Sequence, residues 1–269
     1  MSIGPTTKSI AEMVAERPSV DNQDVFNALW NITTELKEKV FARFDLQPDP
    51  CSAAYQPYGG GDNGPQGFLS TFAGSEIDWL VYSWIGTPNT SFTNMHLTIH
   101  IGPQYDIPHF GFALGTAPDI FMYMDYLPRT DLWSDVSYLD KYYTGTNERF
   151  LQFQSDGRFS PFVSQDMSMR LYQSPTSNCY MVPPTDETTA IIRATAHEMI
   201  DRWLGWFNDA EIVPESQRSA LAARDCYMRQ TICERDPANA IADRLFGKAM
   251  ADELVKTLWG GNRTLPHAG

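Results

Sequence analysis

Apolar residues recur at helical spacing near the start of the chain and again over its last third. Between residues 24 and 41 they fall three or four positions apart, at Val25, Ala28, Leu29, Ile32, Leu36 and Val40. This spacing predicts one amphipathic helix. Three closing helices are predicted at residues 186–207, 215–233 and 237–258. The last has an apolar face made of Ile241, Leu245, Phe246, Met250, Leu254 and Leu258.

The middle of the chain carries short runs of β-branched and aromatic residues with turn formers between them. The runs predict strands at residues 68–72, 77–85, 95–101, 109–114 and 120–126, and one or two more at 167–172 and 179–182. The connections are too short for crossover helices, so the strands are expected to pair antiparallel. Helix, meander and closing helices predict an α/β fold, a three-layer α/β/α sandwich with a central, mainly antiparallel sheet.

The length and hydrophobic content of the chain suit one core. With 269 residues, 42% of them hydrophobic, we expect a single domain over residues 1–269. Residues 1–20 are expected to form a flexible N-terminal segment, and residues 21–262 to form the core. Residues 45–67 are predicted to be a loop, because the YGGGDNGPQG segment has too many glycines for a packed element.

The chain shows no sign of a membrane span or an export signal. No apolar run approaches the roughly 20 residues that cross a bilayer. Glu12 and Glu16 lie where a transit peptide would be rich in Arg and poor in acids. The four cysteines form no CxxC pair, which favours a reducing compartment over a disulfide framework or a zinc site. We therefore expect a soluble, cytoplasmic protein.

Charge excludes one class of partner. The formal net charge is −13, whereas non-specific nucleic-acid binding needs clustered Lys and Arg. We expect no nucleic-acid partner.

One strand carries two histidines on the same face. In NMHLTIHIG the period of two places His96, Thr98 and His100 on one side of the strand and the apolar residues on the other. The apolar side should meet a helix layer, so the histidines look toward a cavity or solvent. The plainest explanation is a solvated strand face or a partly buried histidine with its hydrogen bonds satisfied. A metal site is not expected, because these histidines have no third ligand nearby and HEMID at 197–201 lacks a second His.

An acid precedes the last predicted helix. Asp236 stands before Pro237, which is a helix-start signal because the carboxylate can cap free N–H groups. Asp125, at the end of a predicted strand, is interpreted as a turn acid. Trp84 and Phe112 lie among the aromatic residues of the strands, where most are expected in the core and some beside a flat ligand.

Several segments together resemble the ferredoxin-dependent bilin reductases, a superfamily that includes red chlorophyll catabolite reductase. ERDPANAIADRLFG at 234–247 is similar to the superfamily's closing Asp-Pro-Ala and Leu-Phe-Gly pattern, and YDIPHFG at 105–111 looks like its Tyr-x-x-Pro-x-Phe-Gly segment. MDYLPRTDL followed by SYLDKYY is similar to the chlorophyll catabolite branch. The resemblance covers residues 78–259 and is closest to that branch.

The resemblance implies an oxidoreductase that reduces a linear tetrapyrrole. It implies no bound cofactor, since electrons would come from external ferredoxin and protons from the protein. His96 and Asp236 would be the catalytic pair, in a pocket between the sheet and the C-terminal helices. His100, Trp84, Phe112 and Ala113 are expected to contact the substrate. Ferredoxins are acidic, so docking on this acidic chain would require a local patch of Arg and Lys.

One position departs from the family pattern. Three residues beyond the Phe of the Phe-Gly segment the family has a carboxylate, and this chain has Ala113. Either the regiochemistry of the reduction or the reaction itself should differ. The alternative is a cofactor-free lyase or isomerase that uses acid–base chemistry on an aromatic substrate such as an aryl dimer. A third hypothesis is a non-catalytic carrier of tetrapyrroles or aromatic ligands.

Overall fold

The computed structural model describes residues 8–16, 19–60, 64–90 and 92–260. In the described part of the chain the elements are α1 (Ile10–Glu16), α2 (Gln23–Arg43), β1 (Leu46–Pro48), η1 (Pro50–Tyr55), β2 (Tyr58–Gly59), β3 (Gln66–Gly74), β4 (Ile77–Gly86), β5 (Thr93–Ile101), β6 (His109–Thr116), β7 (Ile120–Leu127), α3 (Val136–Tyr142), η2 (Thr144–Thr146), α4 (Asn147–Ser155), β8 (Ser160–Pro161), α5 (Met167–Tyr172), β9 (Asn178–Val182), α6 (Asp186–Trp206), α7 (Glu215–Arg235), α8 (Asn239–Phe246) and α9 (Lys248–Trp259).

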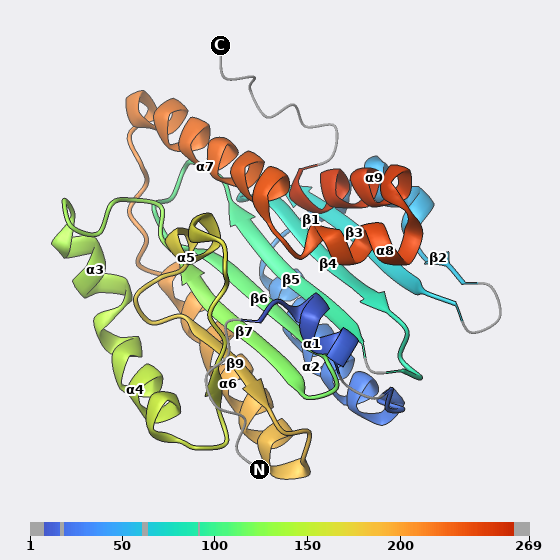
Figure 1. Ribbon diagram of the computed structural model, residues 1–269. Coiled ribbons are helices and arrows are strands. Elements are labelled where there is room, and N and C mark those ends of the chain that lie inside the picture. Colours follow the sequence, from blue (N-terminus) through green and yellow to red (C-terminus); the bar gives the residue numbers. More distant parts are fainter. Residues whose placement is uncertain (1–7, 17–18, 61–63, 91, 261–269) are drawn as a thin grey trace.

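The strands form one sheet with a meander at its centre. Its order is β1-β3-β4-β5-β6-β7-β9-β8, with β2 also paired to β3, and every pair is antiparallel. Helices lie on both faces (Figure 1). The predicted α/β/α sandwich and the five central strands are confirmed.

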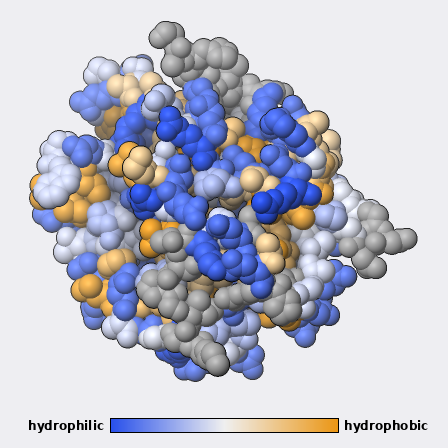
Figure 2. All heavy atoms as spheres, viewed as in Figure 1, coloured by the Kyte–Doolittle hydropathy of each residue, from blue (hydrophilic) through white to orange (hydrophobic). Residues whose placement is uncertain are grey.

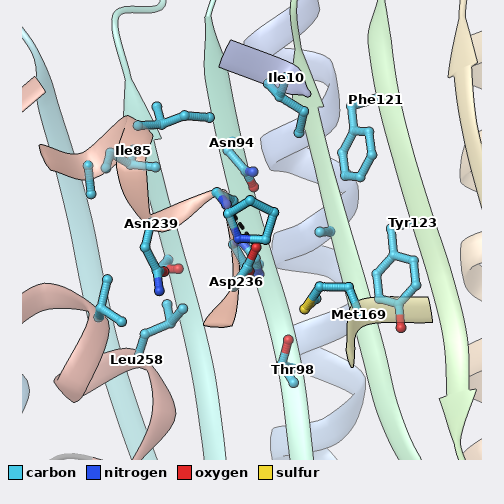
Figure 3. Close-up of a pocket in the computed structure, with 18 of the residues that line it drawn as sticks. Ile10, Ile85, Asn94, Thr98, Phe121, Tyr123, Met169, Asp236, Asn239 and Leu258 are labelled. Atoms are coloured by element: carbon cyan, nitrogen blue, oxygen red, sulfur yellow. Dashed lines mark hydrogen bonds between the residues drawn. The ribbon is translucent and has the colours of Figure 1, made fainter. Parts of the chain in front are cut away.

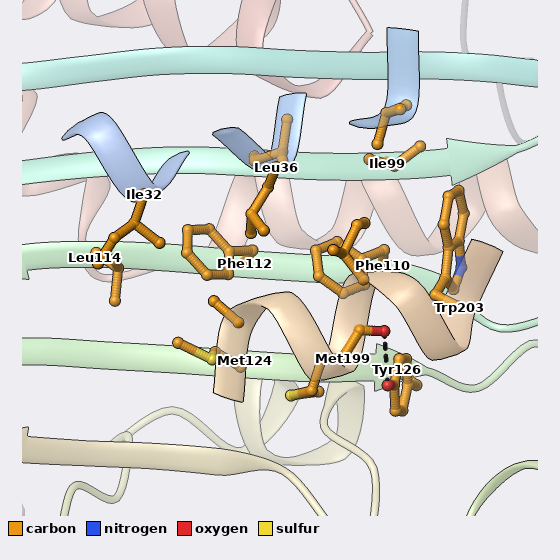
Figure 4. Packing of buried hydrophobic residues seen from close by; sticks show 14 of the residues in the cluster. Ile32, Leu36, Ile99, Phe110, Phe112, Leu114, Met124, Tyr126, Met199 and Trp203 are labelled. Carbon is orange, nitrogen blue, oxygen red and sulfur yellow. Dashed lines mark hydrogen bonds between the residues drawn. The ribbon is translucent and has the colours of Figure 1, made fainter. Parts of the chain in front are cut away.

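The back face of the sheet packs against α2 and α6. Side chains alternate between the two faces along β6, so Phe110, Phe112 and Leu114 all point toward these helices. There they meet residues such as Ile32, Leu36 and Trp203 (Figure 4). Tyr126 donates its hydroxyl hydrogen bond to the carbonyl of Met199 on α6 at 2.9 Å. Full burial of an apolar side chain contributes about 1.5–3 kcal/mol to the stability of the fold. This layer therefore holds the sheet in place, and the residues of its front face with it.

The front face is covered by the C-terminal helices and by α1 (Figure 1). Leu254 of α9 packs on Trp79 and Val81 of β4, and the Trp79 indole donates to the carbonyl of Leu258 at 3.1 Å. The outer surface on this side is mostly hydrophilic, with hydrophobic residues in separate spots (Figure 2). None of the described helices is long and apolar enough to cross a membrane.

Two sequence predictions fail on secondary structure. Residues 167–172 form helix α5 rather than a strand, because the Asp166 carboxylate accepts from the N–H groups of Ser168 and Met169 and starts a helix there. Residues 45–67, predicted to be a loop, contain β1, η1 and β2, and both short strands pair with β3. Residues 61–63 of the glycine-rich segment lie outside the described residues.

The N-terminal segment, expected to be flexible, contains the packed helix α1. Ser9 and Glu12 exchange hydrogen bonds in a capping box at its start. Met13 is buried against Ala113, Ala117 and Phe121 on the front of the sheet. The Ser-x-x-Glu pattern was a sequence signal for this helix. Residues 1–7 and 17–18 lie outside the described part.

The predicted single helix at 237–258 is two helices, α8 and α9, that meet at Gly247. This residue has φ 79° and ψ 154°, a region open almost only to glycine. The apolar face continues across the break, because Phe246 and Leu254 join the same cluster. Helical spacing of apolar residues therefore did not reveal the turn.

Replacing Gly247 by Ala should destabilise the protein by about 1–3 kcal/mol, because a Cβ strains this backbone conformation even though no atom lies within 4 Å of it. Gly205 is the matched control: it lies in α6, also with nothing within 4 Å. There, Ala should raise stability by about 0.5–1 kcal/mol, because it favours the helical conformation. Urea unfolding of both variants measures the two effects. Equal effects of the two substitutions would contradict this explanation of the α8–α9 turn.

Candidate functional site

A cavity of about 210 Å³ lies between the front face of the sheet and its covering helices. Side chains of β4 to β7 form its floor, and residues of α1, α5, α8 and α9 contribute to its walls (Figure 3). Most of its surface is apolar, with a small number of polar groups. Such a composition is typical of a small-molecule site.

His96 lies on the cavity floor. It stands on β5 opposite Ser83 of β4 and Ala113 of β6, and all three line the cavity. Burial disfavours the charged ring and lowers the pKa of His96 to about 4. The ring is therefore neutral near pH 7, able to accept and donate one hydrogen bond but a weak source of protons.

Asp236 reaches the same cavity from the junction of α7 and α8. Helix α7 ends before Pro237, because the residue preceding a proline is disfavoured in helical conformation. One Asp236 carboxylate oxygen accepts from the N–H of Ala238 at 2.9 Å. Because α8 begins at Asn239 with Ala238 as its N-cap, Asp236 holds the turn before the helix and does not cap the helix as predicted. Burial raises the pKa of Asp236, and the carboxylate of Asp166 adds to this increase against the lowering by the Ala238 N–H.

The structure therefore brings the two predicted catalytic residues to one cavity. Asp236 appears in front of β5 between Asn94 and Thr98, the residues that flank His96 on the same face of that strand (Figure 3). Both His96 and Asp236 line the cavity. An acid whose pKa is raised by burial thus shares an apolar cavity with a neutral imidazole, an arrangement suited to moving protons.

Of the four expected substrate contacts, Trp84 and Ala113 line the cavity, whereas Phe112 and His100 do not. Phe112 lies in the core on the back face, because the strand period sets it opposite to Ala113. Trp84 borders the cavity, but its ring packs against Phe26 of α2 on the back face, with ring centroids 4.9 Å apart. His100 is 1% exposed and lies behind Trp259, outside the cavity lining. Ala113 lines the cavity as expected.

Sequence reasoning missed an acid and a phenol on β7. Asp125 was interpreted as a turn acid, but it lies within the strand and is 1% exposed. Its carboxylate accepts from the Ser174 N–H at 2.9 Å and from the Ser174 hydroxyl at 2.5 Å. Tyr123, two residues earlier, lines the cavity. The sequence signal that could have revealed this buried acid is its position inside the apolar run IFMYMDYL.

A buried ionic cluster holds α7 against the sheet beside this site. Arg129 donates from Nε and Nη2 to one oxygen of Asp225, at 3.1 and 2.5 Å. The other oxygen lies 3.2 Å from Nε2 of His109, whose Nδ1 accepts from the N–H of Ile101 at 3.0 Å. Burial opposes the charge on Asp225, but His109 and Arg129 outweigh it and lower the pKa of this carboxyl to about 2.

No metal centre is built by the residues described. Among them, no three His, Cys, Asp or Glu side chains gather as a metal ion requires.

Stability should fall as the pH drops from about 6.5 to 4. Burial lowers the pKa of His96 and His109 to about 4 and that of His100 well below its usual 6.5. The unfolded chain then binds protons that the folded protein excludes, which costs about 3 kcal/mol for each of the first two rings. Asp125 acts in the opposite direction, because burial raises its pKa to about 6. The folded protein therefore takes up a proton at Asp125 on acidification, which offsets the stability loss caused by about one histidine.

Thermal unfolding at pH 7.5, 6.0 and 5.0 measures this effect. The His96→Gln variant should lose less stability over the same range, since one titrating ring is gone. A stability that stays constant down to pH 5 would show that the three rings titrate normally.

Comparisons with known proteins agree with this architecture. The sequence model described as "Red chlorophyll catabolite reductase (RCC reductase)" matches residues 30–259. Red chlorophyll catabolite reductase of barley (Hordeum vulgare) is 24% identical over 196 residues, 66% of this chain and 94% of the relative. Red chlorophyll catabolite reductase 1, chloroplastic, of rice (Oryza sativa subsp. japonica) is 26% identical over 254 residues, 88% of this chain and 76% of the relative. Among solved structures, phytochromobilin synthase from tomato in complex with biliverdin has a TM-score of 0.74 at 18% identity, over 86% of this chain and 83% of the other.

Proposed function

Because the chain belongs to the red chlorophyll catabolite reductase family, we propose that it is a reductase of a linear tetrapyrrole, a bilin or a chlorophyll catabolite. In this proposal ferredoxin supplies the electrons and the protein supplies the protons. The observation that carries it is the meeting of His96 and Asp236 in one apolar cavity. The similar tomato structure was solved with biliverdin, a linear tetrapyrrole.

The two residues have different roles in this reaction. Reduction of one double bond takes two electrons and two protons. Asp236 is the proton donor of the two, because burial raises the pKa of its carboxyl and so favours the protonated form. His96 is neutral, since burial lowers the pKa of its ring to about 4, and it holds the substrate by hydrogen bonding to a pyrrole N–H or a lactam carbonyl.

The apolar cavity wall suits a conjugated substrate. Phe121 and Tyr123 of β7 and Trp259 of α9 line the cavity, and flat rings stack favourably on such side chains. Exclusion of water strengthens the hydrogen bonds that His96 and Asp236 make with the substrate. It also protects a one-electron-reduced intermediate from unwanted protonation.

An anaerobic absorbance titration with biliverdin, followed by reduced ferredoxin, tests the proposal. We expect a bound pigment with a shifted absorption band that bleaches or shifts again when electrons arrive. Binding without any change on electron delivery would favour a carrier. Absence of binding, to biliverdin and to a chlorophyll catabolite alike, would refute the tetrapyrrole assignment.

One observation favours the second candidate, a cofactor-free lyase or isomerase of an aromatic substrate. Ala113 lies in an apolar cluster with Met13 and Phe121, so the family's acid is replaced by a packed hydrocarbon surface. Asp236 and His96 can remove and return a proton without external electrons. Conversion of an aryl dimer by the purified protein with no reductant present would establish this function in place of the reductase.

The cellular location stays a prediction. The rice relative is named chloroplastic, whereas the acidic N-terminal segment of this chain led us to expect the cytoplasm. Cell fractionation with an antibody to the protein would decide between the two.

A further inference from the structure

The residue directly across from Ala113 on the neighbouring strand is a phenol. Tyr123 of β7 pairs in register with Ala113 of β6. Paired residues of an antiparallel sheet point to the same face, with Cβ atoms about 4.5–5.5 Å apart. Tyr123 is half-buried and lines the cavity together with His96 and Asp236. A side chain with an exchangeable proton therefore stands one strand away from the position where the family has its acid.

A glycine makes room for this ring. Gly111 of β6 would bring a Cβ within 3.2 Å of a Tyr123 ring carbon, so the ring leans over β6 rather than standing away from the sheet. Strand β6 lies between β7 and β5, the strand of His96. The ring lies on the β7 side of the cavity, and Met169 lies between it and Asp236 in this view (Figure 3).

The Tyr123 hydroxyl has a buried acid as its partner. It lies 3.4 Å from a carboxylate oxygen of Asp125, a long hydrogen bond of the kind that tightens when substrate closes a site. Ser174 holds both oxygens of that carboxylate. In the described part of the chain no Arg, Lys or His forms an ion pair with Asp125. A carboxyl group that is buried without a cationic partner is unusual for a purely structural residue. Such a group can hold a proton and donate it.

We propose that Tyr123 is a catalytic proton donor of this enzyme, positioned by Gly111 and Asp125, and that it replaces the acid missing at position 113. This inference rests on the proposed reductase function. Asp236 would supply one proton of the reduction, and Tyr123 the other.

The step balances as follows. The external one-electron donor, a ferredoxin, is oxidised twice, and the tetrapyrrole gains two electrons. After the first electron, the phenol O–H bond of Tyr123 breaks and a C–H bond forms on the one-electron-reduced substrate; the second electron and the proton of Asp236 complete the reduction. The resulting phenolate takes the proton of the Asp125 carboxyl, and Asp125 is protonated again by water.

The protonation behaviour of both groups fits these roles. Burial and then the neighbouring Asp125 raise the pKa of Tyr123 well above 10. The phenol therefore keeps its proton until electron delivery creates a strong base. Burial raises the pKa of Asp125 to about 6, so a protonated carboxyl is available close to neutral pH.

Tyr123→Phe tests the proposal, because it removes the hydroxyl and keeps the ring over Gly111. We expect kcat to fall by a factor of about 100 or more, with KM and biliverdin affinity within roughly twofold of wild type. The one-electron-reduced pigment should accumulate and be detected by its absorbance and by electron paramagnetic resonance. Tyr126→Phe is the control, since Tyr126 is buried on the same strand but faces α6, outside the cavity. It should keep the wild-type kcat.

Asp125→Asn tests the positioning residue through the pH profile. Wild-type kcat should decrease as pH rises above about 6, where Asp125 loses its proton. In the variant this part of the limb should be lost, and any limb that remains belongs to Asp236, whose pKa burial also raises. The other titratable groups that interact electrostatically with Asp125 are Tyr123 and Tyr126 on its own strand, Tyr143, Tyr172 and Cys179. Burial raises the pKa of each of them, so none should produce a limb near pH 6.

The outcomes separate the two proposals. A wild-type protein that reduces a tetrapyrrole, with Tyr123→Phe as fast as the Tyr126→Phe control, would overturn the role of Tyr123 and leave the reductase function standing. A wild-type protein that reduces no tetrapyrrole would overturn both. A slow Tyr123→Phe variant that accumulates the radical would support both.

Discussion

Replacing Asp236 by Asn should lower kcat by a factor of about 10² to 10⁴, the usual contribution of a positioned acid. Asn has nearly the same shape, and its carbonyl oxygen can still accept the Ala238 N–H that Asp236 accepts at 2.9 Å. The α7–α8 junction should therefore stay folded, and the affinity for biliverdin should change little. Steady-state turnover with reduced ferredoxin, beside an absorbance titration of binding, measures both quantities.

Asp243→Asn is the matched control for this prediction. Asp243 is an exposed acid on α8, the helix that follows Asp236, and its replacement removes the same charge from the same region. It should leave kcat unchanged. Equal activity of the two variants would show that Asp236 only holds the turn before α8.

Replacing Asp225 by Asn should destabilise the folded protein by about 3–5 kcal/mol, the usual cost of breaking a buried ion pair by removing one partner. The side chains of Arg129 and Asp225 are 1% and 8% exposed. Asn keeps one oxygen that can accept but carries no charge, so the guanidinium stays buried without its counter-ion, beside the neutral carbonyl groups of Gly102 and Tyr105. Because Asp225 belongs to α7 and Arg129 follows β7, the variant should also loosen the helix that ends at Asp236.

Urea unfolding monitored by tryptophan fluorescence measures this loss. Asp201→Asn is the control, because Asp201 makes a surface ion pair with Lys39 and its side chain is 58% exposed. That substitution should cost at most about 1 kcal/mol. A similar small loss for Asp225→Asn would mean that Arg129 finds another partner or water once the carboxylate is gone.

The sequence by itself determined the type of most elements and the face to which each residue points. Alternation along β5 predicted that His96 faces away from the helix layer, and the structure shows this face as the cavity floor. These features follow from local periods, 3.6 residues in a helix and two in a strand, which are visible in a single segment. The same rule would have placed Phe112 on the back face, opposite to Ala113, and we failed to apply it to β6.

Only the tertiary structure decided which of these faces meet. Asp236 stands 140 positions after His96 in the chain, and no local pattern says that the α7–α8 junction lies over β5. The pairing of Tyr123 with Ala113, the lean of its ring over Gly111 and the burial of Asp125 depend likewise on strand register and on the covering helices. The pKa shifts of His96, Asp125 and Asp236 come mainly from burial. Burial is a property of the packed layers rather than of any segment, so the chemistry of the site was settled by packing.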